Sequence, residues 1–330
     1  MSGTPATLFR FRSLLDDSGA LFKRELGALA DGYLYSPPFG SMNDPMEAYY
    51  ETDKASADII DGLLRHTGFR SNEIYKLIRE ETDKFALISF SSTHKAPPMW
   101  AYYASNFAGM CLEFDTELLR VGDLRGERLR PVTYARHPLP PLSLADIDKM
   151  QASVEARLSR KRIEWRHEEE WRYLTGEVGK KHYLDDALLR VFLGPRIKAE
   201  HEAKICQLLR RRPTEVLKGD VVGYELQFRT IQAACPLAEC EKVGGGSFRV
   251  PDEAYRDEEI TKLLSHRIND LVSLCDRHSI RPNSEEFLCF GVSAKPKPHL
   301  YMWTTYKLRS GRIHHHKHSF DHNLRELDLD

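Results

Sequence analysis

Three short segments of the chain each place two polar side chains of one kind two residues apart. They are the arginine pair Arg10 and Arg12, the serine pair Ser89 and Ser91, and the glutamate pair Glu168 and Glu170. Residues two apart on a β-strand project from the same face, so each pair would point into one space if its segment is a strand. Buried hydroxyls and carboxylates need hydrogen-bond partners, which are backbone groups in a structural role and a ligand in a binding role.

The arginine and serine pairs lie in segments with the composition of strands. L-F-R-F-R at 8–12 alternates apolar and basic residues, which predicts a strand that buries Leu8, Phe9 or Phe11 and turns both arginines to the opposite face. F-A-L-I-S-F-S-S at 85–92 is apolar and rich in β-formers, which predicts a strand largely buried on both faces. We therefore expect both pairs to belong to a β-sheet.

An aromatic helix is predicted after the serine strand. The proline pair at 97–98 favours a helix start, because proline is tolerated in the first helical turn, and Gly109 would end the helix. The strand at 110–114 would then complete a unit, 85–115, that is expected to make a sheet edge roofed by aromatic side chains. Three of these aromatics are either core residues or a platform beside a ligand site: Trp100, Tyr102 and Tyr103.

The glutamate pair lies in W-R-H-E-E-E-W-R at 165–172. If this segment is a strand, Arg172 shares a face with both glutamates and becomes a third candidate ligand-binding residue. A helix is predicted before it, at 143–163, and its basic end is expected to be solvated. In a structural role the glutamates would be solvated too, and each exposed ion pair with Arg166 or Arg172 would contribute only about 0.2–1 kcal/mol.

A loop at 36–47 separates the first elements from the serine strand. A helix from about Ser18, ended by Gly32, and a short strand at 33–36 are predicted before it. Its prolines and glycine exclude regular structure, and Asn43 and Asp44 can close Asx turns. The loop is either structural or the rim of a site in which these two residues contact a ligand. Two helices are predicted after it, at 56–84.

After the glutamate segment, the hydrophobic pattern predicts further elements of the same core. They are strands at 191–194 and 221–228 and a helix at 200–212. Residues 232–250, with Pro236 and three consecutive glycines, interrupt the pattern and are expected to be a linker. The core at 1–231 is therefore expected to be a mixed β-sheet with flanking helices and a cleft.

The remaining residues, 251–330, predict a small accessory α+β module. One helix is expected to carry a stripe from Ile260 to Cys275, and three strands are expected after it, at 287–294, 299–309 and 312–318. The whole chain is accordingly expected to belong to the α+β class.

Composition excludes several classes of protein. Charges nearly cancel, with 48 Lys plus Arg against 49 Asp plus Glu, so no overall field attracts nucleic acid or a membrane surface. No apolar run approaches the roughly 18 residues that cross a bilayer, and the N-terminus has no apolar signal core. We therefore expect a cytoplasmic protein without a membrane partner. The six cysteines have no framework spacing, which indicates free thiols.

Two further patterns are candidate metal ligands. His314, His316 and His318 would share one face of the last strand, and Cys235 and Cys240 lie close in sequence. Neither pattern has a matching second set of ligands, so no metal site is predicted.

Five motifs together give a family resemblance. L-F-R-F-R, N-D-P-M-E, M-W-A-Y-Y, G-M-C-L-E-F and W-R-H-E-E-E-W-R occur in this order between about residues 8 and 228. This set resembles the bacterial family known as domain of unknown function 2971. The resemblance implies a role in bacterial anti-phage or stress defence and assigns no chemistry. Residues after about 235 lie outside it.

The order of the three pairs is also similar to the arginine, Ser-x-Ser, Glu-x-Glu pattern of arginine-serine-glutamate ADP-ribosyltransferases. That resemblance implies that NAD is the substrate and that a protein or nucleic acid is the acceptor. The arginine pair would hold the NAD pyrophosphate, and the serine pair would shape the nicotinamide pocket. Glu168 or Glu170 would be catalytic, stabilising the oxocarbenium ion that forms when the glycosidic bond breaks.

Two other functions stay open at this point. One is a non-catalytic ligand-sensing or protein-binding module of a defence system, with the aromatic helix holding the ligand or partner. The other is a Mg²⁺-dependent phosphodiesterase or nuclease, in which Asp44, Glu47 and the glutamate pair supply oxygen ligands. Lys161 or Arg172 would hold the phosphate in that enzyme.

Overall fold

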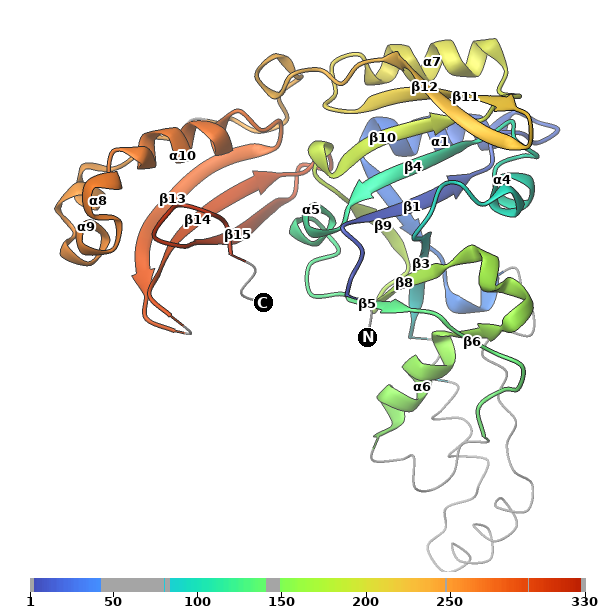
Figure 1. The fold of residues 1–330 in the computed structure, drawn as a ribbon, viewed down its shortest axis with the longest axis horizontal. Helices are drawn as coiled ribbons and strands as arrows, with labels where there is room; N and C mark the ends of the chain where they lie inside the picture. Colours follow the sequence, from blue (N-terminus) through green and yellow to red (C-terminus); the bar gives the residue numbers. More distant parts are fainter. Residues whose placement is uncertain are drawn as a thin grey trace, which may run out of the picture.

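The computed structural model describes residues 3–42, 80, 84–140, 149–246, 248–295 and 297–327. These residues form a large mixed sheet, a three-stranded sheet near the C-terminus, two small two-stranded sheets and helices that pack on them (Figure 1). The α+β class is thereby confirmed. Within the described ranges, no helix is both long and apolar enough to cross a membrane.

The large sheet holds eight strands in the order β12-β11-β10-β4-β1-β3-β8-β5. β10 and β11 run parallel, and the other neighbours run antiparallel, so the sheet is mixed. The bounds are β1 Thr7–Arg12, β3 Ala86–Ser91, β4 Met110–Asp115, β5 Arg128–Pro131, β8 Glu170–Thr175, β10 Leu188–Leu193, β11 Glu215–Val222 and β12 Glu225–Gln232.

The three strands that carry the arginine pair, the serine pair and Glu170 are neighbours in this sheet. β3 lies between β1 and β8, so Ser91 pairs with Phe9 on one side and with Glu170 on the other. The expectation that the unit at 85–115 makes a sheet edge is wrong, because β1 lies between β3 and β4 in the middle of the sheet. Both strands of the unit are apolar on both faces, and such strands gain most from a central position.

β1 and β3 pair with each other over a very short distance. Phe9 with Ser91 is the one Cα pair in their register, whereas β1 pairs with β4 along all of Thr7–Arg12. β1 and β3 therefore separate beyond Phe9, and the sheet has an opening beside Arg10.

Helices cover both faces of the large sheet (Figure 1). On one face, Leu29 and Ile205 of two helices pack with Leu8 in the main hydrophobic cluster. On the other face, the Trp100 ring meets the Phe11 ring edge-on, with centroids 5.3 Å apart. Because successive side chains of β1 point to opposite faces of the sheet, Leu8 and the arginine pair lie on the face opposite to Trp100. The helix bounds are α1 Ala20–Asp31, α4 Pro97–Tyr103, α5 Thr116–Val121 and α7 Ala199–Leu209.

Two glycines allow backbone segments to approach each other behind α4. A Cβ on Gly109 would lie 2.4 Å from the carbonyl oxygen of Arg12, and one on Gly194 would lie 2.1 Å from that of Phe107. The Gly194 amide donates a hydrogen bond to the Gly109 carbonyl at 3.0 Å. Glycine is required at both positions because any side chain would push these segments apart.

The segment before β8 differs most from the expected structure. α6 ends at Leu158, and β7, Arg160–Arg162, then pairs in parallel with β6, Thr133–Ala135. A 3-10 helix at Ile163–Glu168 leads into β8. The helix predicted to 163 is therefore too long, and its basic end is only partly solvated, because Arg157 and Lys161 are buried while Arg162 is exposed. α6 begins at Met150 in the described residues.

The remaining core elements follow the sequence closely, with one exception. Gly32 ends α1 in the left-handed conformation, and β2, Tyr33–Ser36, pairs with β9, Gly179–His182. The single strand predicted at 221–228 is wrong, because a turn at Gly223 (φ +63°) divides the segment between β11 and β12. The helices predicted at 56–84 lie outside the described residues, apart from residue 80 and residue 84.

The C-terminal part is a three-stranded sheet with helices on one face (Figure 1). Its strands confirm the three predicted ones, but the predicted single helix is two helices, separated between Leu264 and Asp270. Leu300 and Met302 pack under these helices. The bounds are α8 Asp252–Arg256, α9 Glu258–Leu264, α10 Asp270–Ser279, β13 Ser284–Ser293, β14 His299–Lys307 and β15 Ile313–Phe320.

Buried ion pairs join the part of the chain that holds the large sheet to the C-terminal part. Asp185, which is 2% exposed, accepts hydrogen bonds from Arg309 at 2.7 and 2.9 Å and lies 3.3 Å from Arg212. Arg281 of the C-terminal part pairs with Asp186 at 2.7 Å. Tyr306 also packs in the main hydrophobic cluster with core residues. The division into units at 1–231 and 251–330 stays a prediction.

Candidate functional site

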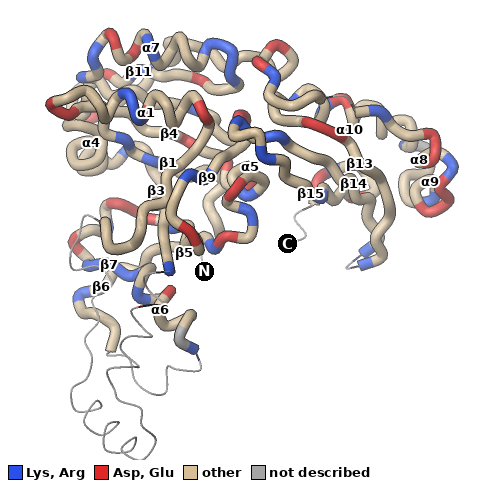
Figure 2. The backbone as a smooth tube through the Cα atoms, turned by 180° about the vertical axis from the view of Figure 1, so that it is seen from behind, with Lys and Arg blue, Asp and Glu red and all other residues tan. Residues whose placement is uncertain are grey.

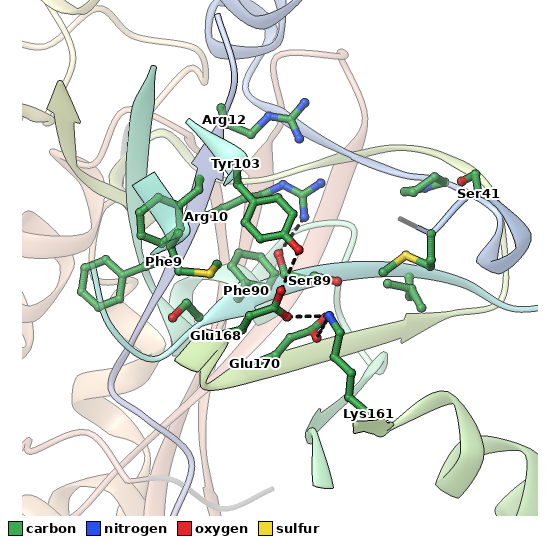
Figure 3. Close-up of a pocket in the computed structure, with 16 residues that line it drawn as sticks. Phe9, Arg10, Arg12, Ser41, Ser89, Phe90, Tyr103, Lys161, Glu168 and Glu170 are labelled. Carbon is green, nitrogen blue, oxygen red and sulfur yellow. Dashed lines mark hydrogen bonds and ion pairs between the residues drawn. The ribbon is translucent and has the colours of Figure 1, made fainter. Parts of the chain in front are cut away.

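A cavity of about 240 Å³ lies where β1, β3 and β8 meet. All three candidate pairs contribute to its wall, although about eighty residues separate one pair from the next. Figure 3 shows the pairs and their neighbours around the cavity. The polar lining residues are Arg10, Arg12, Ser41, Ser89, Ser91, Tyr103, Lys161, Glu168 and Glu170, and the apolar ones include Phe9, Phe11, Leu87, Phe90 and Met99.

The other sequence candidates lie in different places. Tyr103 lines the cavity, but Tyr102 is 67% exposed outside the lining. Trp100 is fully buried away from the lining, and its Nε1 donates to the His94 carbonyl at 2.7 Å. Arg172 lies directly behind the glutamate pair with 0% exposure. Asn43 and Asp44 lie outside the described residues.

Lys161 lines the cavity, although its segment is expected from the sequence to be the solvated end of a helix. β7 carries it under the 3-10 helix, where it is 7% exposed and its Nζ lies 2.5 Å from Glu168 and 3.0 Å from Glu170. The structural alternative, in which the glutamates are solvated on a surface strand, is wrong. Glu168 is 3% and Glu170 is 5% exposed. The sequence signal was the lysine seven residues before Glu168, between two arginines.

The two carboxylates differ in their electrostatic environment. Burial alone would raise the pKa of Glu170, but the positive charges of Arg172 and Lys161 outweigh it and lower the pKa to about 2. Arg172 holds Glu170 through two hydrogen bonds, at 2.7 and 2.9 Å. For Glu168, burial raises the pKa despite the charge of Lys161 and the hydrogen bond from Tyr103. Glu170 is therefore ionised at neutral pH, and Glu168 is the group that more readily holds a proton.

Two tyrosines fix the glutamate segment. The Tyr103 hydroxyl donates to Glu168 Oε1 at 2.6 Å, and burial raises the pKa of this tyrosine, so it stays a donor. The Tyr134 hydroxyl accepts from the Glu170 amide at 2.8 Å. Glu169 between them has a left-handed backbone (φ +43°), which marks the bend from the 3-10 helix into β8.

Arg10 reaches into the opening between β1 and β3. Its Nη1 donates to the Ser89 carbonyl at 2.8 Å, and within the described residues no carboxylate lies within ion-pair distance of it. Burial, followed by the charge of Arg12, lowers its pKa to about 9. The guanidinium remains a cation at neutral pH, and an anionic ligand would stabilise it.

Arg12 has a protein partner instead. Its Nε donates to Glu25 Oε2 at 2.6 Å and its Nη2 to Glu25 Oε1, while Arg24 also contacts Glu25. Arg12 therefore shapes the wall beside Arg10, and its charge is already compensated.

The serine pair is inside the sheet. Ser91 is 1% exposed and its hydroxyl accepts from the Thr93 amide at 3.2 Å. The Ser89 hydroxyl is buried without a hydrogen-bond partner of normal geometry in the described residues, although it is near enough to help lower the pKa of Glu170.

The candidate metal ligands do not form a site within the residues that the structure describes. His314 contacts Asp123 at 2.9 Å, and His318 lies between the Tyr306 hydroxyl, at 2.8 Å, and Glu326, at 2.6 Å. The Cys240 thiol donates to the Cys235 carbonyl.

Among the described residues, the cavity therefore combines a cation without a carboxylate partner, a buried serine hydroxyl beside Glu170, and two buried carboxylates of different protonation tendency. In a comparison with models of known protein families, residues 99–173 match the model described as "Protein of unknown function (DUF2971)". This match confirms the family resemblance for the segment that contains most of α4 and most of β8. A search of curated proteins found no match, and neither did a search of solved structures.

Proposed function

We propose that this chain, with its DUF2971 segment, is an NAD-consuming enzyme of the ADP-ribosyltransferase type. The supporting observation is that the arginine, serine and glutamate pairs line one cavity, with Glu168 at the end of the 3-10 helix and the other five residues on three adjacent strands. The order of these pairs in the chain is similar to that of arginine-serine-glutamate transferases, and their convergence is the arrangement that such chemistry requires.

Each group has a role in this reaction. Arg10, a cation with no carboxylate partner in the described residues, would hold the pyrophosphate. The C1′–N bond of the nicotinamide ribose then breaks, with both electrons leaving on nicotinamide, and the ribose becomes an oxocarbenium ion. The ionised Glu170 stabilises that cation. Glu168 takes the proton of the acceptor nucleophile that attacks C1′, since a carboxylate with a raised pKa is the better base.

The wider assignment follows from the family resemblance and composition. We propose that the enzyme acts in the bacterial cytoplasm as an anti-phage or stress-defence effector, with a protein or nucleic acid as acceptor. Basic and acidic residues are interspersed along the described backbone (Figure 2), so the acceptor would be recognised near the cavity rather than by a field of one sign.

Labelled NAD tests this proposal. We expect release of labelled nicotinamide, and transfer of labelled ADP-ribose in a bacterial lysate, by the wild-type protein. Glu170→Gln should lower the rate about 10²–10³-fold, the usual loss of one electrostatic stabiliser. Glu164→Gln is the matched control, because Glu164 is an exposed acid of the same segment. A wild-type protein that neither releases nicotinamide nor transfers ADP-ribose would sink the idea.

One observation favours a second candidate, a non-catalytic ligand-binding module. Both carboxylates already have cationic partners, Lys161 for the pair and Arg172 for Glu170. These partners reduce the negative charge available to an oxocarbenium ion. Tight NAD binding without any nicotinamide release would support this module over the enzyme.

A further inference from the structure

A second cavity meets the candidate site at the arginine pair. It has a volume of about 660 Å³ and lies on the α1 side of the sheet, between α1, β2 and β4. Both cavities include Arg10, Arg12, Pro37 and Ser41 in their walls. Because β1 and β3 pair at one position only, the shared wall lies beside the opening in the sheet. We call the smaller cavity the acidic chamber and the larger one the α1 chamber.

Size argues that the two chambers serve one ligand. The acidic chamber, at about 240 Å³, is smaller than the roughly 300–1,000 Å³ of ordinary small-molecule sites. It can enclose only one end of a nucleotide-sized ligand. The α1 chamber has ample volume but lacks the glutamate pair, so a reaction that needs those carboxylates would take place outside it.

Charge identifies the middle of the ligand. At the junction, Arg10 donates one hydrogen bond to the Ser89 carbonyl. Its other N–H groups have no partner among the described residues and can bind a ligand. Glu25 in the α1 chamber does not oppose an anion, because Arg12 and Arg24 both pair with it. The junction therefore carries net positive charge and suits a phosphate or diphosphate.

The α1 chamber suits a flat, uncharged group. Its walls include the aliphatic Leu29 and Leu112 and the tyrosines of β2, Tyr33 and Tyr35. Lys180, which is not part of this wall, lies 4.2 Å from the centre of the Tyr33 ring. A purine or nicotinamide nucleoside has this combination of a planar body and polar edges.

We infer that the ligand spans both chambers: it is a diphosphate-linked dinucleotide whose reacting end lies in the acidic chamber, whose diphosphate binds Arg10, and whose second nucleoside fills the α1 chamber. The inference rests on the proposed function for the identity of the reacting end. The α1 chamber and its residues are additional to the three pairs.

Calorimetric titration with NAD, ADP-ribose, AMP and nicotinamide mononucleotide at fixed salt concentration tests the inference. NAD should bind at least tenfold more tightly than AMP or nicotinamide mononucleotide. Ala28 of α1 lines the α1 chamber, so Ala28→Phe should remove that tenfold advantage and leave the affinity for nicotinamide mononucleotide unchanged. Lys23→Phe, on the exposed side of the same helix, is the matched control and should change neither affinity.

The result separates this inference from the proposed function. If NAD binds no more tightly than its halves, if Ala28→Phe keeps the advantage, or if none of the probes binds, the two-chamber ligand is overturned. If the expected affinities are found but no nicotinamide is released, the enzyme proposal fails and the two-chamber site stands. Tyr33→Leu, a smaller change in the same wall, gives the same comparison should Ala28→Phe fail to fold.

Discussion

At the scale of single residues, the charge balance around Lys161 determines the state of the site. Lys161 and Arg172 face Glu168 and Glu170 in a buried group whose formal charges cancel. Removing one member of such a group leaves an uncompensated buried charge, which costs more than the group as a whole contributes. Arg10 is then the one cation lining the cavity that no carboxylate of the described residues pairs with.

Lys161→Met should therefore destabilise the fold by about 3–5 kcal/mol, measured by urea unfolding at pH 7. Loss of the ammonium group should also raise the pKa of Glu168 further, because Lys161 favours the ionised carboxylate. As the solution is acidified, any activity that needs ionised Glu168 should then be lost at a higher pH in Lys161→Met than in the wild type.

Lys180→Met is the control for this prediction. Lys180 is 51% exposed and makes a surface ion pair, so its loss should change stability by no more than about 0.5 kcal/mol. An equal loss for both variants, or an acid limb of the pH profile that does not move in Lys161→Met, would contradict the role given to Lys161.

At the scale of elements, close backbone contacts hold α4 and β4 in place behind the site. Gly109 follows the α4 segment and starts the return to β4, with the Arg12 carbonyl 2.4 Å from the place of an added Cβ. The neighbour is main chain of β1, which also carries the arginine pair, so any adjustment moves the site itself.

Gly109→Ala should destabilise the protein by about 1–3 kcal/mol or more, because overpacking forces a backbone shift. Gly27→Ala should have the opposite effect on stability. Gly27 lies in the interior of α1, where an added Cβ meets no atom within 4 Å, so alanine should stabilise this helix by about 0.5–1 kcal/mol. Thermal unfolding of the two variants measures both effects. Similar melting temperatures for the two variants would show that the close contact is not constraining.

Most elements could be predicted from sequence because each carries its own pattern. The alternation of β1, the stop at Gly32 and the aromatic helix after the proline pair are local signals. The end of α6 and the burial of Lys161 could not be predicted locally, because pairing of β7 with β6 overrides the helical pattern. Sheet order was equally hidden, since β1 enters between β3 and β4 from a distant part of the sequence.

The candidate site was only partly visible for the same reason. The three pairs could be found by their spacing, and the cavity joins them. The cavity's other partners are long-range: Tyr103 reaches Glu168 across 65 residues, and Tyr134 reaches Glu170 across 36. Trp100, by contrast, is an aromatic residue of the kind that forms a ligand platform, but it is fully buried in the core.

At the scale of the whole molecule, the C-terminal part is joined to the large sheet by charge. Asp185 is buried between Arg309 and Arg212, and its own amide donates to Asn283 at 2.6 Å. Asp123 similarly holds His314 and Arg312, and these contacts lower its pKa to about 2 although burial opposes the shift.

Asp185→Ala should lower the free energy of unfolding by about 3–5 kcal/mol, because it removes the anion of buried Arg212 and leaves Arg309 with only the more distant Glu241. Limited proteolysis should then cut first in the 232–250 segment, which connects the two parts. Asp220→Ala is the control, since its ion pair with Arg229 is exposed and should be worth less than about 1 kcal/mol. Unchanged proteolysis of Asp185→Ala would show that these ion pairs do not hold the parts together.

The adjacency of β1, β3 and β8 also bears on how this protein can vary in evolution. The strands that pair side by side are far apart in the chain, and the stretch between the serine and glutamate pairs itself supplies β4 and β5 of the same sheet. Insertions and deletions in the connections between strands would leave β1, β3 and β8 in register, whereas changes within β4 or β5 would alter the sheet itself. Relatives of very different length are then expected to share the ordered arginine, Ser-x-Ser and Glu-x-Glu strands, and a search keyed to spacing would overlook them.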